Sequence, residues 1–580
     1  MIRSALAASA LLLSACSSET PDAKEDGLAA QDASTGLLMP LPLSTTAAIT
    51  EDDLSVRIKT LSDDAFEGRG PGSEAGEAAA DWIAAEMARI GLQPGVGDSY
   101  FQTVEMVEQT VDEALSSLTF DGGASGTPFP MTLREDAVLW TKRQNEMELS
   151  LEESELVFVG YGSVAPEYDW NDYAGLDARG KTVVMLVNDP GFATEDPDLF
   201  KARAMTYYGR WTYKFEEAAR QGAAGAIIVH ETAPASYGWD VVANSWSGAQ
   251  ADLVRPDGGA ERAIAEGWIT VETARKLFAD AGLDFEEMKE AAKTPGFTPV
   301  EMGGMTASAE IVQSIERKES RNVVGVLPGE TAPGEYILYT AHWDHLGKKS
   351  AERTGEPGQD FYRDDIFNGA VDNATGVAAI LDVAEAMAGE PMERSVLFLA
   401  VTLEESGLLG SAYYAENPTV PPAQIVAGVN VDAPRPIGLT KDIVVIGSGA
   451  SELEDRLAAI VAEQGRVVKP DPRPEAGFFY RSDHVEFAKK GVPMLYTKNG
   501  DDLVEGGEAT GKAFETVYTA ERYHKPFDEY DDNWNLSGLV QDVTTIHQLG
   551  RDLAQSDDWP EWRDGNEFKA IRDASRAGLN

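Results

Sequence analysis

Short apolar runs alternate with amphipathic stretches over the second half of the chain. Five runs begin at residues 336, 395, 425, 442 and 492 and read "YILYTAH", "SVLFLAVTLEE", "IVAGVNVDAP", "DIVVIGSG" and "VPMLYTKNG". Apolar runs of this length between helical patterns are typical of a sheet whose strands are joined by helices. The pattern therefore predicts an α/β fold with a mixed, mostly parallel sheet and helices on both faces.

The first half of the chain begins with a helical pattern and then becomes rich in predicted strands. In "GSEAGEAAADWIAAEMARIGLQPG", one face carries Ala79, Ile83, Met87 and Ile90, and Gly91 follows as a stop signal. Residues 100 to 142 then favour strands. From about 150 to 300 we expect a separate unit, with strands in "SELVFVGYG" and "KTVVMLVND" and helices around them.

The first residues, "MIRSALAASALLLSACSS", have the pattern of an export signal. Arg3 precedes an apolar stretch that is too short to span a bilayer, and "LSAC" ends at Cys16. This looks like a bacterial lipoprotein signal, with Cys16 as the acylated residue. We expect a signal segment at 1–16, a flexible tether at 17–48, and an exported protein anchored in the membrane, facing the periplasm or the cell exterior. A plain secretory signal is the alternative.

Charge and cysteine content narrow the possible functions. The chain has 98 acidic and 48 basic residues, for a formal net charge of -50. Such a surface repels nucleic-acid phosphates, so we expect no nucleic-acid partner. Cys16 is the only cysteine, which leaves no internal disulfide. Any metal site must therefore use histidine and carboxylate ligands.

Ligand-type side chains follow several of the predicted strands. "YILYTAH" ends in His342, the next run ends in Glu404 and Glu405, and "IVAGVNV" leads to Asp432. Asp372 lies in a turn before a helix. One such residue at a strand end is commonplace, but several at the same edge of one sheet are hard to explain by packing. Ligand sites in open α/β sheets lie at this edge.

The wording of these segments adds a family resemblance. "TAHWDHLG", "NGAVDNATGVA", "LEESGLLGS", "GVNVDAP", "YRSDHVEFAKKGVP" and "RYHKPFDEYDD" resemble the exported dinuclear zinc aminopeptidases, a group that includes glutamate carboxypeptidase. The likeness covers about 50–145 and 315–555. It implies a zinc exopeptidase domain from 49–147 and 305–580, and the middle unit, 148–304, looks like an inserted β-rich protease-associated domain.

The resemblance implies a site for two Zn²⁺ ions. His342 and Asp432 would hold one ion, Glu405 and His524 the other, and Asp372 would bridge them. These ligand types suit zinc, and two such ions activate water and polarise a carbonyl. Cobalt and manganese fit the same ligand types.

The resemblance also assigns residues around the metals. Glu404 would be the general base, which accepts a proton from water and passes it to the leaving amine. Asp344 would accept the other ring N–H of His342 and fix its tautomer. His345 would hydrogen-bond or pack in the turn and would not be a ligand. His230 and His547 are expected to be structural or solvated.

Two downstream histidines compete for the last ligand position. The family pattern favours His524, because Tyr523 precedes it and Asp528 follows. Arg481, Ser482, Asp483 and His484 would then lie near the substrate, together with Tyr523. The segment from 348 to 367, longer than in the simplest family members, would form a loop over the entrance.

The expected function is a metallopeptidase that removes N-terminal residues from peptides. A receptor-like binding protein without catalysis is disfavoured, because every implied ligand and Glu404 are present. A glutaminyl cyclase, with one zinc, is disfavoured by the two-metal set and the middle unit. A dipeptidase or a carboxypeptidase acting on acidic C-terminal residues stays open. The latter would need an arginine clamp, for which the candidates are Arg353, Arg363, Arg435 and Arg481.

Overall fold

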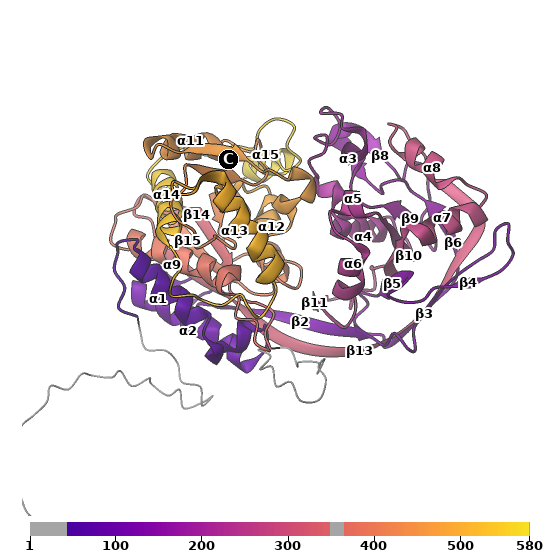
Figure 1. Ribbon diagram of the computed structural model, residues 1–580, viewed down its shortest axis with the longest axis horizontal. Helices are drawn as coiled ribbons and strands as arrows, with labels where there is room; N and C mark the ends of the chain where they lie inside the picture. Colours follow the sequence, from indigo (N-terminus) through magenta and orange to yellow (C-terminus); the bar gives the residue numbers. More distant parts are fainter. Residues whose placement is uncertain (1–42, 349–364, 579–580) are drawn as a thin grey trace, which may run out of the picture. The chain divides into compact units, whose positions relative to one another are not determined.

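The computed structural model describes residues 43–348 and 365–578 (Figure 1). The predicted signal segment with Cys16, most of the predicted tether, and Arg353 and Arg363 lie outside the described residues. Among the helices of the described part, none combines the length and apolar character needed to cross a membrane.

A mixed sheet organises the first and last thirds of the described chain. Its strands follow the order β11-β2-β13-β15-β14-β16-β19-β17-β18, and β1 also pairs with β13. The bounds are β1 Gln93–Pro94, β2 Phe101–Val111, β11 Ala249–Leu253, β13 Val300–Leu327, β14 Ala332–His342, β15 Arg394–Val401, β16 Ile425–Asn430, β17 Asp442–Val445, β18 Val467–Pro470 and β19 Met494–Asn499. The central strands β15, β14, β16 and β19 are parallel, which confirms the predicted fold class.

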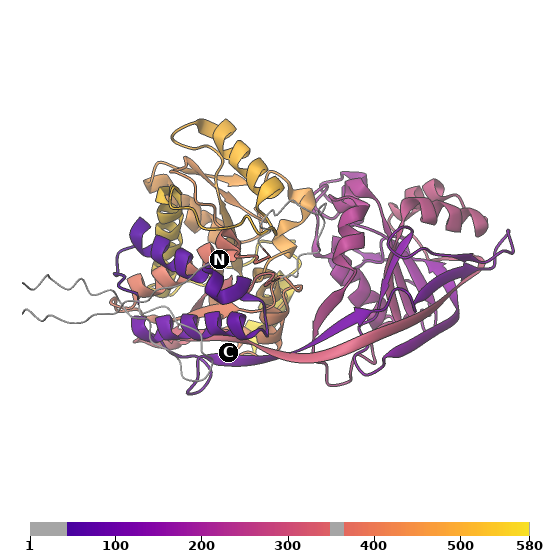
Figure 2. The ribbon, with the colours of Figure 1, turned by 60° about the horizontal axis from the view of Figure 1, so that its bottom comes forward.

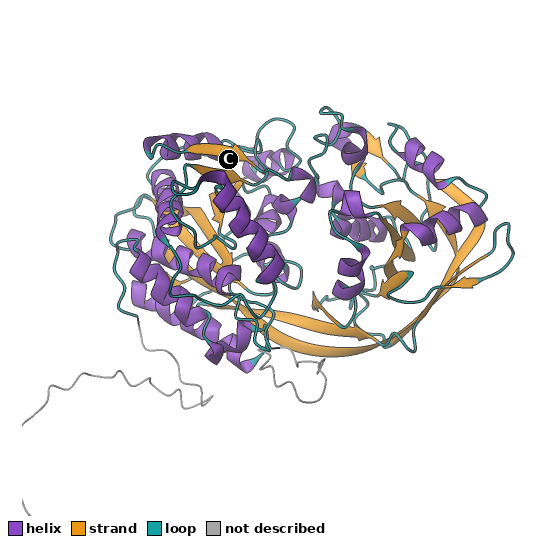
Figure 3. Cartoon of the chain, in the orientation of Figure 1, coloured by secondary structure: helices purple, strands orange, loops and turns teal. Residues whose placement is uncertain are grey.

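Helices cover both faces of this sheet (Figures 1 and 3). Leu338 packs in one cluster with Tyr414 and Phe487, whereas the hydroxyl of its neighbour Tyr339 donates to the carbonyl of Ile546. Adjacent residues of a strand point to opposite faces, so the helices of Tyr414 and Ile546 lie on opposite sides. The helices around this sheet are α1 Glu51–Leu61, α2 Glu74–Ile90, α9 Thr375–Met387, α10 Leu409–Glu416, α11 Leu453–Glu463, α12 His484–Ala488, α13 Gly507–Glu521, α14 Ser537–Ala554 and α15 Lys569–Ala577.

The predicted stop signal of α2 functions as expected. The Ser73 side chain accepts a hydrogen bond from the Gly76 N–H and caps the first turn. Gly91 ends the helix in a left-handed conformation with φ 102°, which a residue without Cβ adopts at little cost. Ala79, Ile83 and Met87 are buried on the predicted face.

A second sheet occupies the middle of the chain, in the order β4-β3-β13-β6-β9-β10-β12-β5. Its strands are β3 Ser117–Asp121, β4 Phe129–Pro130, β5 Ala137–Trp140, β6 Glu148–Phe158, β9 Thr182–Leu186, β10 Gly225–His230 and β12 Ala265–Thr270, and β7 Val164–Ala165 pairs with β8 Trp170–Asn171 nearby. The accompanying helices are α3 Pro190–Thr194, α4 Trp211–Arg220, α5 Thr232–Ala235, α6 Trp239–Ser245, α7 Val271–Asp280 and α8 Phe285–Ala292.

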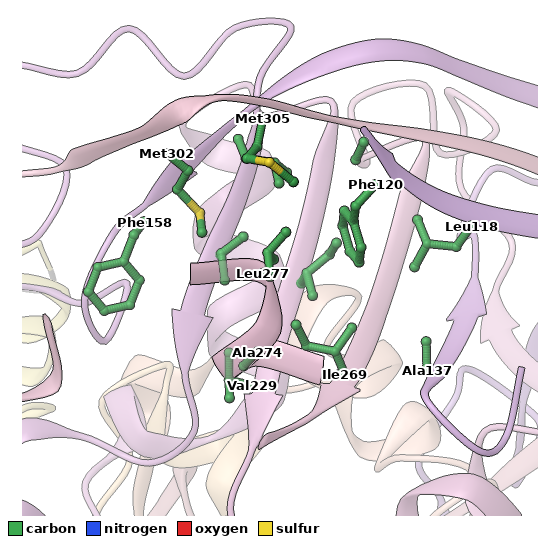
Figure 4. Close-up of a cluster of buried hydrophobic side chains, with 14 of the residues drawn as sticks. Leu118, Phe120, Ala137, Phe158, Val229, Ile269, Ala274, Leu277, Met302 and Met305 are labelled. Carbon is green, nitrogen blue, oxygen red and sulfur yellow. The ribbon is translucent and has the colours of Figure 1, made fainter. Parts of the chain in front are cut away.

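Phe120, Phe158, Leu277 and Met302 form part of the apolar core under this second sheet (Figure 4). Phe120 lies on β3, in a segment that the sequence analysis assigned to the first peptidase part. An apolar alternation predicts a strand, but it does not predict which strand that segment pairs with. In the structure, the strands between residues 117 and 140 pair in the second sheet and not in the first. The wider domain division stays a prediction.

The 28-residue strand β13 belongs to both sheets. Its residues 300–312 pair with β6 and its residues 313–323 pair with β2. Figures 1 and 2 show β13 extending through both groups of elements, and β2 lies beside the part of β13 that belongs to the first sheet. The predicted boundary between residues 304 and 305 therefore falls inside a continuous strand.

A buried ionic network joins the N-terminal helices to α9. Arg57, fully buried on α1, forms ion pairs with Asp382 and Glu385 of the α9 region. Arg89 on α2 pairs with Glu385 at 2.9 Å and with Glu86 at 2.8 Å. These contacts fix α1 and α2 against the helix that follows Asp372.

Arg57→Ala is expected to lower the free energy of unfolding by about 3–5 kcal/mol, because it leaves buried carboxylates without their counter-ion. Lys59→Ala is the matched control on the same helix: Lys59 pairs with Asp532 at 3.0 Å, but both side chains are mostly exposed. Denaturant unfolding of both variants tests the difference. Equal stability of the two variants would contradict the assigned role of Arg57.

Candidate metal centre

The parallel strands deliver ligand-type side chains to one edge of the first sheet. β14 ends at His342, Glu404 follows β15 after two residues, and Asp432 follows β16 after one. Because these strands run in the same direction, their carboxyl ends meet at that edge. The predicted juxtaposition of these residues is thus present in the structure.

The first group of side chains surrounds the Nε2 atom of His342. Asp372 Oδ1 lies 3.3 Å from this nitrogen, and Asp432 Oδ1 lies 3.4 Å from it. Glu404 Oε2 is more distant, at 4.0 Å. His342 Nε2 is buried and has no hydrogen-bond partner.

The second group surrounds the Nε2 atom of His524. Glu405 Oε2 lies 3.1 Å from this nitrogen, and Asp372 Oδ2 lies 3.3 Å from it. The two oxygens of Asp372 therefore face different histidines, which is the arrangement of a bridging carboxylate.

These distances fit metal ligation. Ligand atoms around one tetrahedral zinc, each about 2.0–2.1 Å from the ion, stand roughly 3.3 Å apart. Four carboxylates also gather here, those of Asp372, Glu404, Glu405 and Asp432, and one ligand atom from each of His342, Glu404 and Asp432 lies within 4.8 Å of the others. Buried like charges are costly unless protons or a cation neutralise them, and the residues present fit two zinc ions.

The carboxylates around His524 also favour a positive charge on its ring. Burial lowers its pKa, but Glu405 and Asp372 outweigh burial and raise the pKa to about 10. A histidine binds a metal in its neutral form, so ion binding at this position displaces a proton.

The backbone is strained at three positions beside these ligands. Leu403, Ala433 and His524 have φ values of 58°, 50° and 55°. Residues with a Cβ rarely adopt this left-handed region, and such strain is concentrated at functional sites. Leu403 and Ala433 adjoin Glu404 and Asp432 of the first group, and His524 belongs to the second.

Glu404 is held beside the first group rather than within ligand distance. Its N–H donates to Asp344 Oδ1 at 3.1 Å, so this carboxylate fixes the start of the Glu-Glu pair. Burial, together with the Asp432 and Glu405 carboxylates, raises the pKa of Glu404 well above its usual range. A carboxylate in this setting has a high proton affinity, which suits a general base.

Asp344 contacts the His342 ring through its main-chain carbonyl and not through its carboxylate. The Nδ1 atom of His342 lies 3.2 Å from the Asp344 main-chain carbonyl, but 3.9 Å from its carboxylate. The carbonyl therefore accepts the ring N–H and leaves Nε2 free for ligation. The Asp344 carboxylate instead binds the Glu404 backbone.

His345 supports the second group. Its Nδ1 atom lies 2.5 Å from Glu405 Oε1, while the other Glu405 oxygen faces His524. The residue is buried, and one ligand-type atom from each of His345, Asp372 and Glu405 lies within 4.8 Å of the others. Its hydrogen bond fixes one oxygen of Glu405, and the prediction that His345 is not itself a ligand stays a prediction.

Two residues that the sequence analysis did not assign to the site hold the Asp372 segment. Asp528 accepts hydrogen bonds from the N–H groups of Val371 and Asp372, at 3.1 and 3.0 Å. The buried Arg69 donates to the carbonyls of Trp343 at 2.7 Å and Gly369 at 2.8 Å. Both bind main-chain groups, which carry no sequence signal.

The predicted substrate-binding residues divide into two sets. Ser482, Asp483 and His484 are fully buried, and Asn430 donates to the Ser482 hydroxyl while Ser411 donates to Asp483. Burial also lowers the pKa of His484 to about 3, so its ring is neutral. These side chains are enclosed by the protein, and their contact with a substrate stays a prediction.

Arg481 and Tyr523 retain exposed surface. Tyr523 is 44% exposed, and its ring stacks on that of His524 with 3.9 Å between centroids. Arg435, one of the candidates for a carboxylate clamp, is instead occupied by the carbonyl of Asn499 and by Asp501.

Residues 322–545 match the model of peptidase family M28. An aminopeptidase of Rattus norvegicus, NAALADL1, is 29% identical over 133 residues, which cover 21% of this chain and 15% of the relative. The aminopeptidase YwaD of Bacillus subtilis is 25% identical over 107 residues, 18% of this chain and 20% of the relative. The chain thus spans less than a quarter of the length of these curated relatives.

Among solved structures, an aminopeptidase from Aneurinibacillus sp. strain AM-1 has 18% sequence identity and a TM-score of 0.46, with 88% of this chain and 95% of that chain covered. A zinc aminopeptidase from Bacillus subtilis has 17% identity and a TM-score of 0.41, with coverages of 88% and 97%. The family match contains every predicted metal ligand, from His342 to His524. Residues 322–545 of this chain are thus similar to peptidase family M28.

Proposed function

We propose that the protein is a dinuclear zinc exopeptidase that removes N-terminal residues from peptides. One observation carries the proposal: two groups of ligand-type side chains meet at Asp372, whose oxygens lie 3.3 Å from His342 and 3.3 Å from His524. The family match supports a peptidase, and the curated relatives named above are aminopeptidases.

His342, Asp432, Glu405 and His524 would hold the two zinc ions, with Asp372 between them. Bound zinc supplies Lewis-acid chemistry, lowering the pKa of water and polarising a carbonyl. Glu404 takes the proton of the attacking water and returns it to the leaving amine nitrogen. Asp344 holds the Glu404 backbone for both transfers, and His345 keeps Glu405 in place.

Glu404→Gln should lower kcat by roughly 10²- to 10⁴-fold, because the amide keeps the size of the side chain but cannot accept the proton. Steady-state hydrolysis of aminoacyl-anilides measures the loss, and the zinc content should not change. Glu416→Gln, at an exposed glutamate that pairs with Lys490, is the control and should keep wild-type rates. A variant at position 404 with near-normal kcat would show that another group is the base.

The purified protein should contain two zinc ions per chain, and a chelator should abolish hydrolysis until zinc is restored. Asp372→Ala should bind less metal than the wild type, because both groups lose a shared carboxylate. Elemental analysis of both proteins, with Asp177→Ala on the exposed surface as control, measures this. One zinc or none in the wild type would contradict the dinuclear site.

We also propose that the protein is exported and anchored in the membrane by a lipid on Cys16, with the peptidase facing the periplasm or the cell exterior. The proposal rests on the sequence of residues 1–16. The middle unit is proposed to be a protease-associated domain.

Cys16→Ser should move the protein from the membrane fraction to the soluble fraction of the exporting cell, because the thiol is the attachment point of the lipid. Labelling with radioactive palmitate should mark the wild type and not the variant. Unlabelled wild-type protein in the soluble fraction would favour a plain secretory signal.

A further inference from the structure

The turn "EGRG", residues 67–70, comes from the N-terminal part of the chain, outside the segment that matches the peptidase family. Three consecutive residues of this turn, Glu67, Gly68 and Arg69, have φ values of 42°, 70° and 51°. Residues with a Cβ rarely adopt this left-handed region, so holding two of them there costs free energy. Such a conformation persists only where the contacts around it outweigh that cost.

The main chain of this turn approaches two remote segments at once. The Arg69 carbonyl accepts the N–H of His345 at 3.2 Å, and the Gly68 carbonyl accepts that of Gly347 at 3.0 Å. A Cβ on Gly68 would lie 2.5 Å from the Phe367 carbonyl oxygen and 2.6 Å from that of Gly347. A side chain at this position would therefore push the turn away from both segments.

The Arg69 side chain joins the same two segments and is buried. Its Nε donates to the Trp343 carbonyl at 2.7 Å, its Nη1 to the Asn368 carbonyl at 2.6 Å, and its Nη2 to the Gly369 carbonyl at 2.8 Å. Nη1 also donates to the carbonyl of Leu61, the last residue of α1, at 2.8 Å. One rigid guanidinium group therefore connects the two segments to each other and to α1.

Each of these segments carries a proposed metal ligand. His342 directly precedes Trp343, and Asp372 lies in the turn that follows Gly369. His342 Nε2 and Asp372 Oδ1 are 3.3 Å apart. Because the two residues are remote in the sequence, the distance between the imidazole and the carboxylate depends on how their main chains are joined in space.

Asp528 holds the other side of the Asp372 segment. Its carboxylate accepts the N–H groups of Val371 and Asp372, and its main-chain carbonyl accepts the Ala370 N–H at 2.9 Å. The segment from 368 to 372 is thus bound through its carbonyls by Arg69 and through its N–H groups by Asp528. This restricts where the Asp372 carboxylate can lie.

We propose that Arg69 is a positioning residue for the metal centre: its guanidinium group sets the distance between His342 and Asp372, and thereby the affinity for zinc. Arginine suits this role because its planar fork presents donors in fixed directions, whereas the ammonium group of lysine is a single point. Removing contacts that orient metal ligands lowers metal affinity by about 10- to 100-fold. This inference rests on the proposed two-zinc site and adds a residue outside the ligand set.

Arg69→Ala and Arg69→Lys should each lower the affinity for zinc by about tenfold or more. The lysine side chain keeps the positive charge, but its one nitrogen cannot bind both segments as the fork does. Competition with a chromophoric chelator measures zinc affinity without any substrate. The absorption spectrum of the cobalt-loaded protein should also change in both variants, because the ligand geometry changes.

Arg572→Ala is the matched control. Arg572 is also fully buried, and its Nη2 atom donates to the carbonyls of Ile425 and Val426 at 3.0 and 3.1 Å. These carbonyls lie at the amino end of β16, whereas Asp432 follows its carboxyl end. Arg572→Ala should therefore unfold at a lower denaturant concentration, as the Arg69 variants should, but it should keep the wild-type zinc affinity and cobalt spectrum.

Wild-type zinc affinity in Arg69→Lys, or an equal loss of affinity in Arg572→Ala, would overturn the proposal. Charge alone would explain the first result, and general stability would explain the second. If Arg69→Ala does not fold, the comparison of Arg69→Lys with Arg572→Ala still decides.

The zinc measurement is independent of catalysis. If the wild type binds two zinc ions but hydrolyses no peptide, the proposed function fails, and a tenfold loss of zinc affinity confined to the Arg69 variants still supports the positioning role. If the wild type hydrolyses peptides and the Arg69 variants bind zinc as tightly as it does, the positioning role fails alone.

Discussion

The carboxylates at the carboxyl edge of the first sheet repel one another, and the arrangement of the metal centre depends on how this repulsion is offset. Asp372, Glu404, Glu405 and Asp432 cannot all stay charged in a buried place without cations between them. In the proposed centre the histidines would supply neutral nitrogen ligands. The Glu404 N–H donates to Asp344, and His345 hydrogen-bonds to Glu405, so each glutamate has one fixed contact. The left-handed backbone conformations of Leu403, Ala433 and His524 occur at or next to these side chains.

Much of the fold could be predicted from the chain because its signals are local. Apolar runs followed by His342 or Asp432 identify a strand and its functional end at once, since parallel strands share an edge. Asp372 precedes α9 in a turn that is visible in the sequence. Glu404 and Glu405 also follow a segment whose sequence predicts a strand. The sequence therefore predicts that these residues lie at the site, although it gives no distances between them.

Other features depend on contacts that no local pattern records. Arg69 and Asp528 bind main-chain groups of remote segments, and any residue can offer a carbonyl or an N–H. Polar residues of the "RSDH" segment were expected to lie near the substrate, and the sequence did not predict that Ser482 and His484 are buried.

Because β13 belongs to both sheets, the two sheets are not separate modules of the chain. Domains joined by loops can shift or be exchanged as modules, but here the single strand β13 pairs with β6 in one sheet and with β2 in the other. Excision of the middle unit at the boundaries suggested by sequence would sever this strand and strip β2 of part of its environment. Movement of the middle unit relative to the first sheet would therefore have to bend or twist β13 itself.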